Sequence, residues 1–506
     1  MRVSDFPAFR VVVQARFLLS VVFCLGSVQL ASAQNCPALR RLKLPGARVS
    51  LSQLETSGAF KALHGPEIIG MPEFCRVFVR AKPSARSNVQ IEVWLPLHTW
   101  NRRLVGIGNG GFGGIIDYTQ LSEALRGGYV AATTDMGTAP ASPTQADALI
   151  GKPEKWKDFG YRATHIMTGI AKRLTLAFYG SRAEFSYFRG CSTGGQQGLS
   201  EAQRYPADYD GIVSGAPAYA RTRLHAAILW NYRYLSLAVA AGLTPAKLSL
   251  LSSAVINACG MHPDRSSLVY VTNPATCAFD PLVLRCTQGV STNCFSSVEI
   301  EAVRHVYEGP KTSQGEMIYP GLASGSDANW YLPLAQDEAG EVPFASIFRW
   351  VFGPSWRWTD FDFDTDVTTV DQRLGPWLNA TDTDLTTFQQ MGHKLLLYHG
   401  WADPLIAPQG TIDYLEHVQE RWTKVQHSAE SSTRLFMVPG MAHCGGGTGP
   451  AHLDLLPTLR AWVEQGIVPE KITVVGLDYD TGTQTLCPYP EEAVPDLGSG
   501  RSCVRR

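Results

Sequence analysis

The 506-residue chain has almost no net charge, no internal repeat and no long apolar run. Its 44 Lys and Arg residues balance 45 Asp and Glu residues, so nothing in the charge favours binding to nucleic acid. The sequence also lacks coiled-coil heptads, and its apolar stretches are too short for a secure membrane anchor. We therefore expect neither a nucleic-acid nor a membrane partner, and the length allows a large core in one or two domains.

None of the eleven cysteines stands in a C-x-x-C pair, which argues against a zinc site. One of them, Cys24, lies in segment 1–33, which starts with arginines, continues with a short apolar run and closes on Ala31-Ser32-Ala33. This pattern is typical of a secretory signal peptide. Its removal leaves ten cysteines, an even number suited to pairing outside the cytosol. We predict a secreted or periplasmic protein.

The most informative motif is the turn Gly190-Cys191-Ser192-Thr193-Gly194. It follows the β-like run 185–188 and leads into segment 196–202, which can be helical. A serine in G-x-S-x-G between a strand and a helix is a nucleophile elbow, in which small residues allow a sharp turn that exposes the hydroxyl. The pattern makes Ser192 the candidate nucleophile.

A matching acid and base follow later in the chain. Asp403 comes after the buried-strand run 395–398 and a glycine turn, and His443 comes after the run 435–438 and a loop. A serine hydroxyl needs a base to take its proton, and an acid to hold the imidazole tautomer. The order Ser, Asp, His is that of α/β-hydrolases. The alternative makes Ser192 a helix cap, Asp403 a turn residue and His443 a loop residue.

A glycine-rich loop, Gly108–Gly114, follows the predicted strand Leu104–Ile107. In an α/β-hydrolase such a loop can aim a backbone N–H at the substrate oxyanion, and the N–H of Thr193 would supply the second donor. Gly110 and Gly111 are both candidates for the first donor. A dinucleotide-binding loop is the alternative, but the helix-opening context and the later acidic residue are missing.

Alternating apolar runs and helical patterns predict a mostly parallel sheet with helices on both faces. The predicted elements are strands at Val89–Leu95, Arg103–Ile107, Tyr129–Thr133, Gly211–Ser214, Lys394–Tyr398 and Arg434–Val438, and a helix at Arg162–Phe178. The interval between residues 214 and 394 is too long for a crossover. We therefore divide the mature chain into a first core part (34–219), an inserted lid (220–387) and a second core part (388–506).

Aromatic residues crowd one segment of the predicted lid, where they could form a flat apolar surface for an aromatic acyl group. Arg349 among them could pair with a carboxylate or hydroxyl of that group. The alternative is a small lid core with Arg349 on its surface. The group comprises Phe344, Phe348, Arg349, Trp350, Phe352, Trp356 and Trp358, of which Phe348, Arg349, Trp350 and Phe352 are the candidate substrate-binding residues.

The Cys-Ser pair of the elbow, Asp403 and the His443-Cys444 pair resemble the tannase and feruloyl esterase family. Further matching pieces are segments 108–114, 134–137, 205–211 and 214–217, so the resemblance covers most of the mature chain. It implies an α/β-hydrolase fold with a large inserted lid domain, and a cofactor-free serine esterase. Its small-molecule substrate would be an ester of an aromatic (phenolic) acid, cleaved through an acyl-serine. The family includes mono(2-hydroxyethyl) terephthalate hydrolase, so a terephthalate- or phthalate-monoester hydrolase is the alternative. A non-catalytic binding relative is a third interpretation.

Cys191 and Cys444 directly precede and follow two residues that must touch. Neighbours of a hydrogen-bonded pair could meet the Cα separation of about 4.4–6.8 Å that a disulfide needs. The alternative is that Cys191 is a nucleophilic thiol, which a disulfide would prevent. Proximity and the resemblance together suggest five pairs: Cys36–Cys75, Cys191–Cys444, Cys259–Cys277, Cys286–Cys294 and Cys487–Cys503.

One segment departs from the family pattern. Many relatives have a calcium loop between two lid cysteines, but the segment from Cys259 to Cys277 holds a single aspartate, Asp264, with Arg265 beside it. Calcium takes about six to eight oxygen ligands. We therefore predict that this site is lost and that the chain has no metal site.

Overall fold

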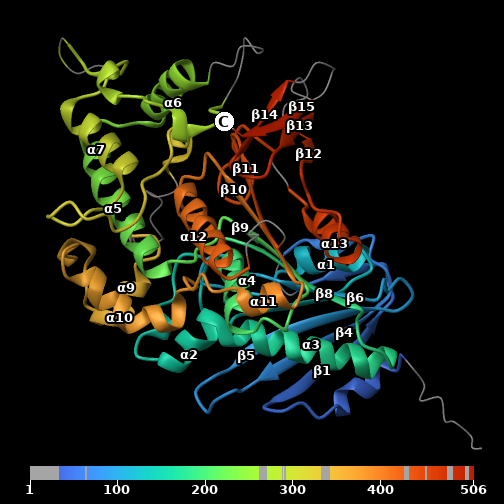
Figure 1. The fold of residues 1–506 in the computed structure, drawn as a ribbon. Coiled ribbons are helices and arrows are strands. Elements are labelled where there is room, and N and C mark those ends of the chain that lie inside the picture. The colour runs from blue at the N-terminus through green and yellow to red at the C-terminus, as the bar shows by residue number, and fades with distance from the viewer. Residues whose placement is uncertain are drawn as a thin grey trace, which may run out of the picture.

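A nine-stranded sheet forms the centre of the molecule (Figure 1). The computed structural model describes residues 34–62, 65–260, 270–287, 289, 292–331, 342–426, 432–450, 453–475, 483–495 and 501–505. The predicted signal peptide 1–33 lies outside these residues, and so does segment 261–269, which includes Asp264 and Arg265. The strands in spatial order are β1 (Ala47–Glu55), β4 (Phe74–Ala81), β5 (Val89–Pro96), β7 (Val130–Thr134), β6 (Arg103–Ile107), β8 (Phe185–Cys191), β9 (Gly211–Gly215), β10 (Lys394–Gly400) and β11 (Thr433–Val438).

The sheet is parallel from β7 to β11 and antiparallel from β1 to β7. Each strand predicted from the sequence is present, with ends that differ by at most three residues, the largest difference being at the end of β8. The predicted mostly parallel α/β sheet is therefore confirmed. The antiparallel strands β1 and β4 extend it beyond the prediction.

The central strands are mostly apolar, as expected for strands with both faces of the sheet covered. Successive side chains point to opposite faces: Leu104 and Val130 join one buried cluster, while Val105 and Ala131 join the other. Helices α3 (Ala163–Tyr179), α4 (Thr193–Arg204) and α12 (Pro408–Gln426) cover the first face, and α1 (Tyr118–Arg126) and α13 (Leu456–Gln465) cover the second.

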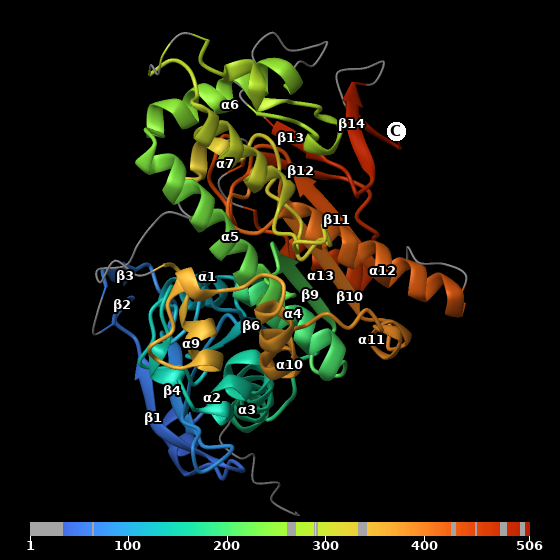
Figure 2. The same ribbon diagram turned by 90° about the vertical axis from the view of Figure 1, so that its left-hand side faces the viewer.

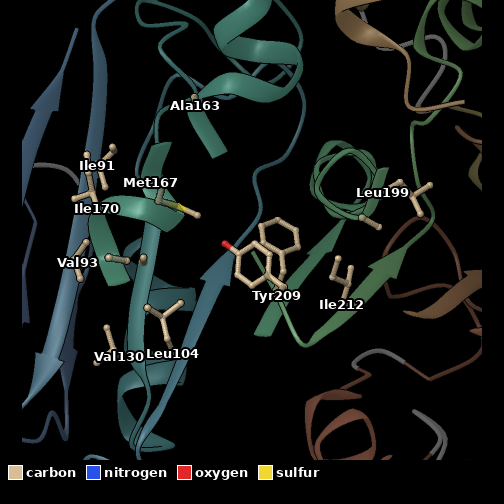
Figure 3. Packing of buried hydrophobic residues seen from close by; sticks show 14 of the residues in the cluster. Ile91, Val93, Leu104, Val130, Ala163, Met167, Ile170, Leu199, Tyr209 and Ile212 are labelled. Carbon is tan, nitrogen blue, oxygen red and sulfur yellow. The ribbon is translucent and has the colours of Figure 1, made fainter. Parts of the chain in front are cut away.

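Helix α3 shows how the sequence specifies this packing. Its buried residues recur every three or four positions, so they form one apolar stripe. Figure 3 shows Ile170 of this stripe against Ile91 and Val93 of β5. The helix ends at Gly180, which takes the left-handed conformation (φ 73°) that glycine adopts most readily at a helix C-terminus.

Residues 216–393 leave the sheet after β9 and return to it at β10. The helices among the described residues of this segment are α5 (Arg221–Ala240), α6 (Pro245–Cys259), α7 (Ser297–Glu308), α9 (Ser346–Phe352), α10 (Asp366–Leu378) and α11 (Thr386–Gln390). Helices α5, α6 and α7 stand at one end of the molecule, and α10 lies beside α2 (Pro153–Lys157) of the core (Figure 2). In the part of the chain that is described, no single helix is long and apolar enough to cross a membrane, although α5 and α6 taken as a bent pair are.

Short antiparallel pairs complete the fold: β2 (Ala59–Lys61) with β3 (Glu67–Ile69), β12 (Ile472–Val475) with β13 (Thr483–Leu486), and β14 (Glu491–Pro495) with β15 (Arg501–Arg505). Five disulfides cross-link the chain with Cα separations of 5.0 to 5.9 Å. Their pairings are those suggested by the sequence: Cys36–Cys75, Cys191–Cys444, Cys259–Cys277, Cys286–Cys294 and Cys487–Cys503.

Candidate active site

Ser192 stands at the sharp turn between β8 and α4. Its backbone has φ 63° and ψ −118°, a conformation that costs energy for any residue with a side chain. Two hydrogen bonds hold it there: the Ser192 N–H donates to the Gly215 carbonyl (2.9 Å), and the Ala218 N–H donates to the Ser192 carbonyl (3.0 Å). The turn is therefore fixed from the neighbouring strand β9, as a nucleophile elbow requires.

Two flanking glycines are needed for this close packing. A Cβ at Gly190 would lie 2.6 Å from the Gly194 carbonyl, and a Cβ at Gly195 would lie 2.3 Å from the Gly215 oxygen. Both distances are shorter than real Cβ atoms tolerate, so any larger residue would force the strand and helix apart.

His443 and Asp403 form the second part of the site. The His443 Nδ1 lies 2.7 Å from Asp403 Oδ2. A carboxylate can only accept, so Nδ1 carries the proton and the lone pair stays on Nε2. This tautomer leaves Nε2 able to take a proton from a serine hydroxyl.

The Asp403 carboxylate is fully buried and receives several N–H donors. Its Oδ1 accepts from the backbone N–H groups of Leu405 (2.8 Å) and Ile406 (2.9 Å). Burial by itself raises the pKa of Asp403, but His443 and the hydrogen bonds from His399 and His443 outweigh burial and hold that pKa well below its usual range. Asp403 is therefore a fixed negative charge beside His443.

His399 is a site residue that the sequence analysis missed. Its Nε2 lies 3.1 Å from Asp403 Oδ2 and 3.0 Å from the Ile406 carbonyl, and its Nδ1 lies 2.7 Å from Thr411 Oγ1. A carbonyl only accepts, so Nε2 donates and Nδ1 accepts from the threonine. His399 thus holds the carboxylate from the side opposite its backbone donors. A polar residue at the end of the apolar run of β10 was the available signal.

The Cys191–Cys444 disulfide joins the residue before Ser192 to the residue after His443, with a Cα separation of 5.9 Å. Ser192 and His443 line one cavity of about 610 Å³. The structure thus brings the predicted nucleophile, acid and base into one neighbourhood, linked covalently on one side and by hydrogen bonds on the other.

Two of the predicted oxyanion donors line the same cavity, and the third, Thr193, directly follows its lining residue Ser192. Gly110 and Gly111 line it, and the Thr193 hydroxyl donates to the Gly111 carbonyl (2.6 Å). The Thr193 N–H belongs to the first turn of α4, where N–H groups have no partner within the helix. Gly111 has φ 52°, and a Cβ there would lie 2.0 Å from the Pro143 oxygen, so only glycine fits.

The four candidate substrate residues lie elsewhere in the structure. Phe348 and Trp350 are buried in a cluster with Phe112 and Phe159, and Phe352 packs at its edge. The Arg349 guanidinium is buried and pairs with Asp147 (3.0 Å). None of the four is among the described residues that line the cavity. Phe344, another member of that aromatic group, does line it.

Charged and apolar residues that the sequence analysis did not single out complete the cavity. Among its described lining residues, Asp117, Glu123 and Asp454 are acidic, and Arg189 is the single arginine or lysine. Arg189 pairs with Glu123 (3.1 Å). Apolar lining comes from Ile115, Val213, Phe344, Leu405, Leu453, Leu455 and Leu456.

A second polar cluster lies outside this cavity. His165, Glu201 and Asp208 bring potential metal-ligand atoms within 4.8 Å of one another, and His165 Nδ1 contacts Asp208 (2.6 Å). Glu201 is fully buried beside Asp208. Burial first, and then the charge of Asp208, raise the pKa of Glu201 well above its usual value. Burial thus favours the neutral form of Glu201 over the carboxylate.

Comparison with known proteins agrees with this geometry. Residues 75–504 match the family model described as tannase and feruloyl esterase. An uncharacterized esterase of Xanthomonas campestris pv. campestris is 32% identical, over 95% of this chain and 92% of its own. Mono(2-hydroxyethyl) terephthalate hydrolase of Piscinibacter sakaiensis is 30% identical, over 84% of this chain and 82% of its own. The crystal structure of feruloyl esterase B from Aspergillus oryzae superposes with a TM-score of 0.83 at 25% identity, covering 93% of this chain and 99% of that one. The chain belongs to the tannase and feruloyl esterase family and is a carboxylic ester hydrolase with the α/β-hydrolase fold.

Proposed function

We propose that Ser192, His443 and Asp403 are the catalytic triad of this esterase, and that it hydrolyses esters of aromatic acids. The observation that carries the proposal is the charged Asp403 held 2.7 Å from His443 Nδ1, at a cavity shared with the strained Ser192. No cofactor enters the proposed reaction, because these three side chains supply the nucleophile, the base and the acid.

In the acylation half, Ser192 Oγ attacks the ester carbonyl carbon while its proton passes to His443 Nε2. The carbonyl π electrons move onto the oxygen. The resulting oxyanion accepts hydrogen bonds from the N–H of Thr193 and from the N–H of Gly110 or Gly111. Asp403 stabilises the imidazolium that forms. When the intermediate collapses, the bond to the alcohol breaks, His443 returns its proton to that alcohol, and an acyl-serine remains.

In the deacylation half, a water molecule attacks the acyl-serine and gives its proton to His443. Collapse of the second tetrahedral intermediate breaks the bond to Ser192 Oγ, which recovers the proton. The products are the free acid and the original enzyme. Loss of one oxyanion donor typically costs about 2.7–4 kcal/mol of transition-state stabilisation, so both donor positions matter.

The cavity favours an uncharged phenolic acyl group. Its volume of about 610 Å³ lies within the usual range of ligand sites, and much of its lining is apolar. A terephthalate monoester would bring a carboxylate toward Asp117, Glu123 and Asp454, while the one described guanidinium in the lining already pairs with Glu123. We therefore place phenolic esters ahead of terephthalate monoesters, and keep the latter as the alternative because of the hydrolase relative.

We further propose that residues 220–387 act as the lid and that the protein works in an oxidising compartment, outside the cell or in the periplasm. Phe344 supports the first point, because it reaches the cavity from this segment. Five disulfides support the second, because such bonds persist where thiols are not kept reduced.

The test of the proposal is Ser192→Ala. We expect hydrolysis of methyl ferulate to fall by about 10⁶-fold, and labelling by a fluorophosphonate probe to disappear, with no change in fold. Ser200→Ala is the matched control, since it removes the hydroxyl of a buried serine on the same helix, away from the cavity. Unchanged turnover or labelling in Ser192→Ala would show that another residue is the nucleophile. Comparing methyl ferulate, methyl gallate and mono(2-hydroxyethyl) terephthalate then ranks the acyl groups.

A further inference from the structure

Arg221 is a buried cation that pairs with no carboxylate among the described residues, and it lies one side chain away from the proposed oxyanion hole. It is 2% exposed, and its Nε has no hydrogen-bond partner. Burial lowers its pKa to about 9, and no acidic group offsets that effect. It therefore stays charged at neutral pH in a place where an unpaired charge destabilises the fold.

The surroundings of Arg221 add further positive potential from two helix ends, and one aromatic ring attracts its charge. Arg221 is the first residue of α5, where the helix dipole is already positive. Its guanidinium lies over the ring of Phe159, 4.9 Å from the centroid. The nearby His225 is neutral, because burial and the charge of Arg221 lower its pKa to about 3. The start of α4 adds a second positive helix end at Thr193.

A directed hydrogen-bond chain connects Arg221 to both sides of the oxyanion hole. The Arg221 Nη2 donates to Thr193 Oγ1 (2.8 Å), and Thr193 Oγ1 donates to the Gly111 carbonyl (2.6 Å). Arginine can only donate, so the threonine hydroxyl must accept from it and point its own proton at Gly111. Thr193 carries one proposed oxyanion donor, and Gly111 lies in the loop that carries the other.

We propose that Arg221 is a positioning residue for the oxyanion hole, and that its uncompensated charge favours the anionic tetrahedral intermediate over the neutral ester. The hydrogen-bond chain fixes Thr193 and the loop at Gly111 relative to each other. The charge lies within about 10 Å of the oxyanion, given the Arg221–Thr193 contact and the short covalent path from Thr193 Oγ1 to its N–H. In a buried site such a charge is weakly screened. The negative charge that forms on the oxyanion during the reaction would thus be the charge that Arg221 stabilises.

The proposal rests on the proposed function and predicts which kinetic constant changes. Arg221→Met keeps an unbranched, though shorter, side chain and removes both the charge and the hydrogen bond to Thr193, so kcat should fall about 10- to 100-fold, with KM within twofold of the original value. A phenylboronic acid, which binds serine esterases as an anionic tetrahedral adduct, should lose affinity by a similar factor. The melting temperature should stay the same or rise, because a buried unpaired charge has gone.

Two further variants separate charge from position. Arg221→Lys keeps the charge and should recover a large part of the lost kcat. Thr193→Val removes the hydroxyl that links Arg221 to Gly111 while keeping the backbone N–H, so it should also lower kcat at constant KM, and Thr193→Ser should restore it. If Arg221→Met does not fold, Arg221→Lys and Thr193→Val against Thr193→Ser give the same comparison.

The inference is overturned if Arg221→Met retains kcat and boronic-acid affinity within twofold, or if it loses activity only in step with a lower melting temperature. It is also overturned if Thr193→Val is as active as Thr193→Ser. A different result would refute the proposed function: Ser192→Ala that still hydrolyses the ester or is still labelled by the probe. Wild-type labelling at Ser192 combined with a fully active Arg221→Met refutes only the role of Arg221.

Discussion

Removing the Cys191–Cys444 disulfide should reduce both stability and turnover. This bond closes a loop with a sequence separation of 253, for which the chain-entropy relation gives about 5.5 kcal/mol as an upper value. Native disulfides generally deliver less, so we expect the Cys191→Ala/Cys444→Ala variant to lose about 2–5 kcal/mol of unfolding free energy. Cys444 has φ 63°, and alanine keeps a Cβ there, so the backbone strain is the same in both proteins.

The effect on turnover comes from position rather than stability. The bond holds the residue before Ser192 against the residue after His443, and a misplacement of about 1 Å between reacting groups can cost roughly a hundredfold in rate. Cys487→Ala/Cys503→Ala is the matched control. Its loop has a sequence separation of 16, so it should lose at most about 3 kcal/mol, and its distance from the cavity should leave kcat unchanged.

Urea unfolding and steady-state hydrolysis of methyl ferulate, measured on both double variants, check this prediction. The reasoning is refuted if the Cys191/Cys444 variant keeps the original kcat while its stability falls, since the bond would then stabilise the fold without aligning the site. Peptide mapping of the unreduced protein should recover the linked pair. Two freely alkylated cysteines in active enzyme would contradict the bond itself.

Three further predictions concern single groups. Asp403→Asn should lower kcat about 10⁴-fold in steady-state assays while leaving the melting temperature close to that of the original protein, because the amide cannot hold the His443 tautomer; a loss below tenfold would contradict the assignment. Glu201→Gln should gain melting temperature relative to the original protein as the pH rises from 5 to 8. Because folding raises the pKa of Glu201, this group stabilises the folded protein fully below its unfolded pKa, and the stabilisation is lost as the pH rises through its folded pKa. A difference in melting temperature between the two proteins that does not change with pH would refute this. Chelator should leave kcat and melting temperature unchanged, since the segment from Cys259 to Cys277 has one aspartate; a large drop in either would reveal a bound cation.

The core strands and the elbow could be predicted because their signals are local. Strand β6 is a buried run of Leu, Val, Gly and Ile after the half-buried Arg103, and its predicted and observed bounds are the same, Arg103–Ile107. The elbow combines glycines with a serine at a junction whose geometry few other residues allow. Such patterns depend on neighbours along the chain, which the sequence contains directly.

The remaining features depend on partners far away in the sequence. The terminal strands β14 and β15 have little apolar character, and their pairing places Ala493 opposite Cys503, whose disulfide reaches Cys487. The aromatic residues around Arg349 look alike in sequence whether they line a cavity or fill a core, and the pairing with Asp147 distinguishes the two. The contacts of His399 and Arg221 likewise become visible only in three dimensions.

The neighbouring positions of β9 and β10 make the region between them exchangeable. The two strands pair directly and run parallel, with Lys394 opposite Gly211, so the 216–393 segment leaves at the C-terminal end of β9 and returns at the N-terminal end of β10, about 13 Å away along the strands. Lengthening a chain segment between fixed ends costs only about 0.6 kcal/mol per doubling. Evolution or design can therefore replace most of this segment, including Phe344 in the cavity, without altering the register of the sheet. The junction should fall after Arg221, whose contact with Thr193 belongs to the part that carries out the chemistry.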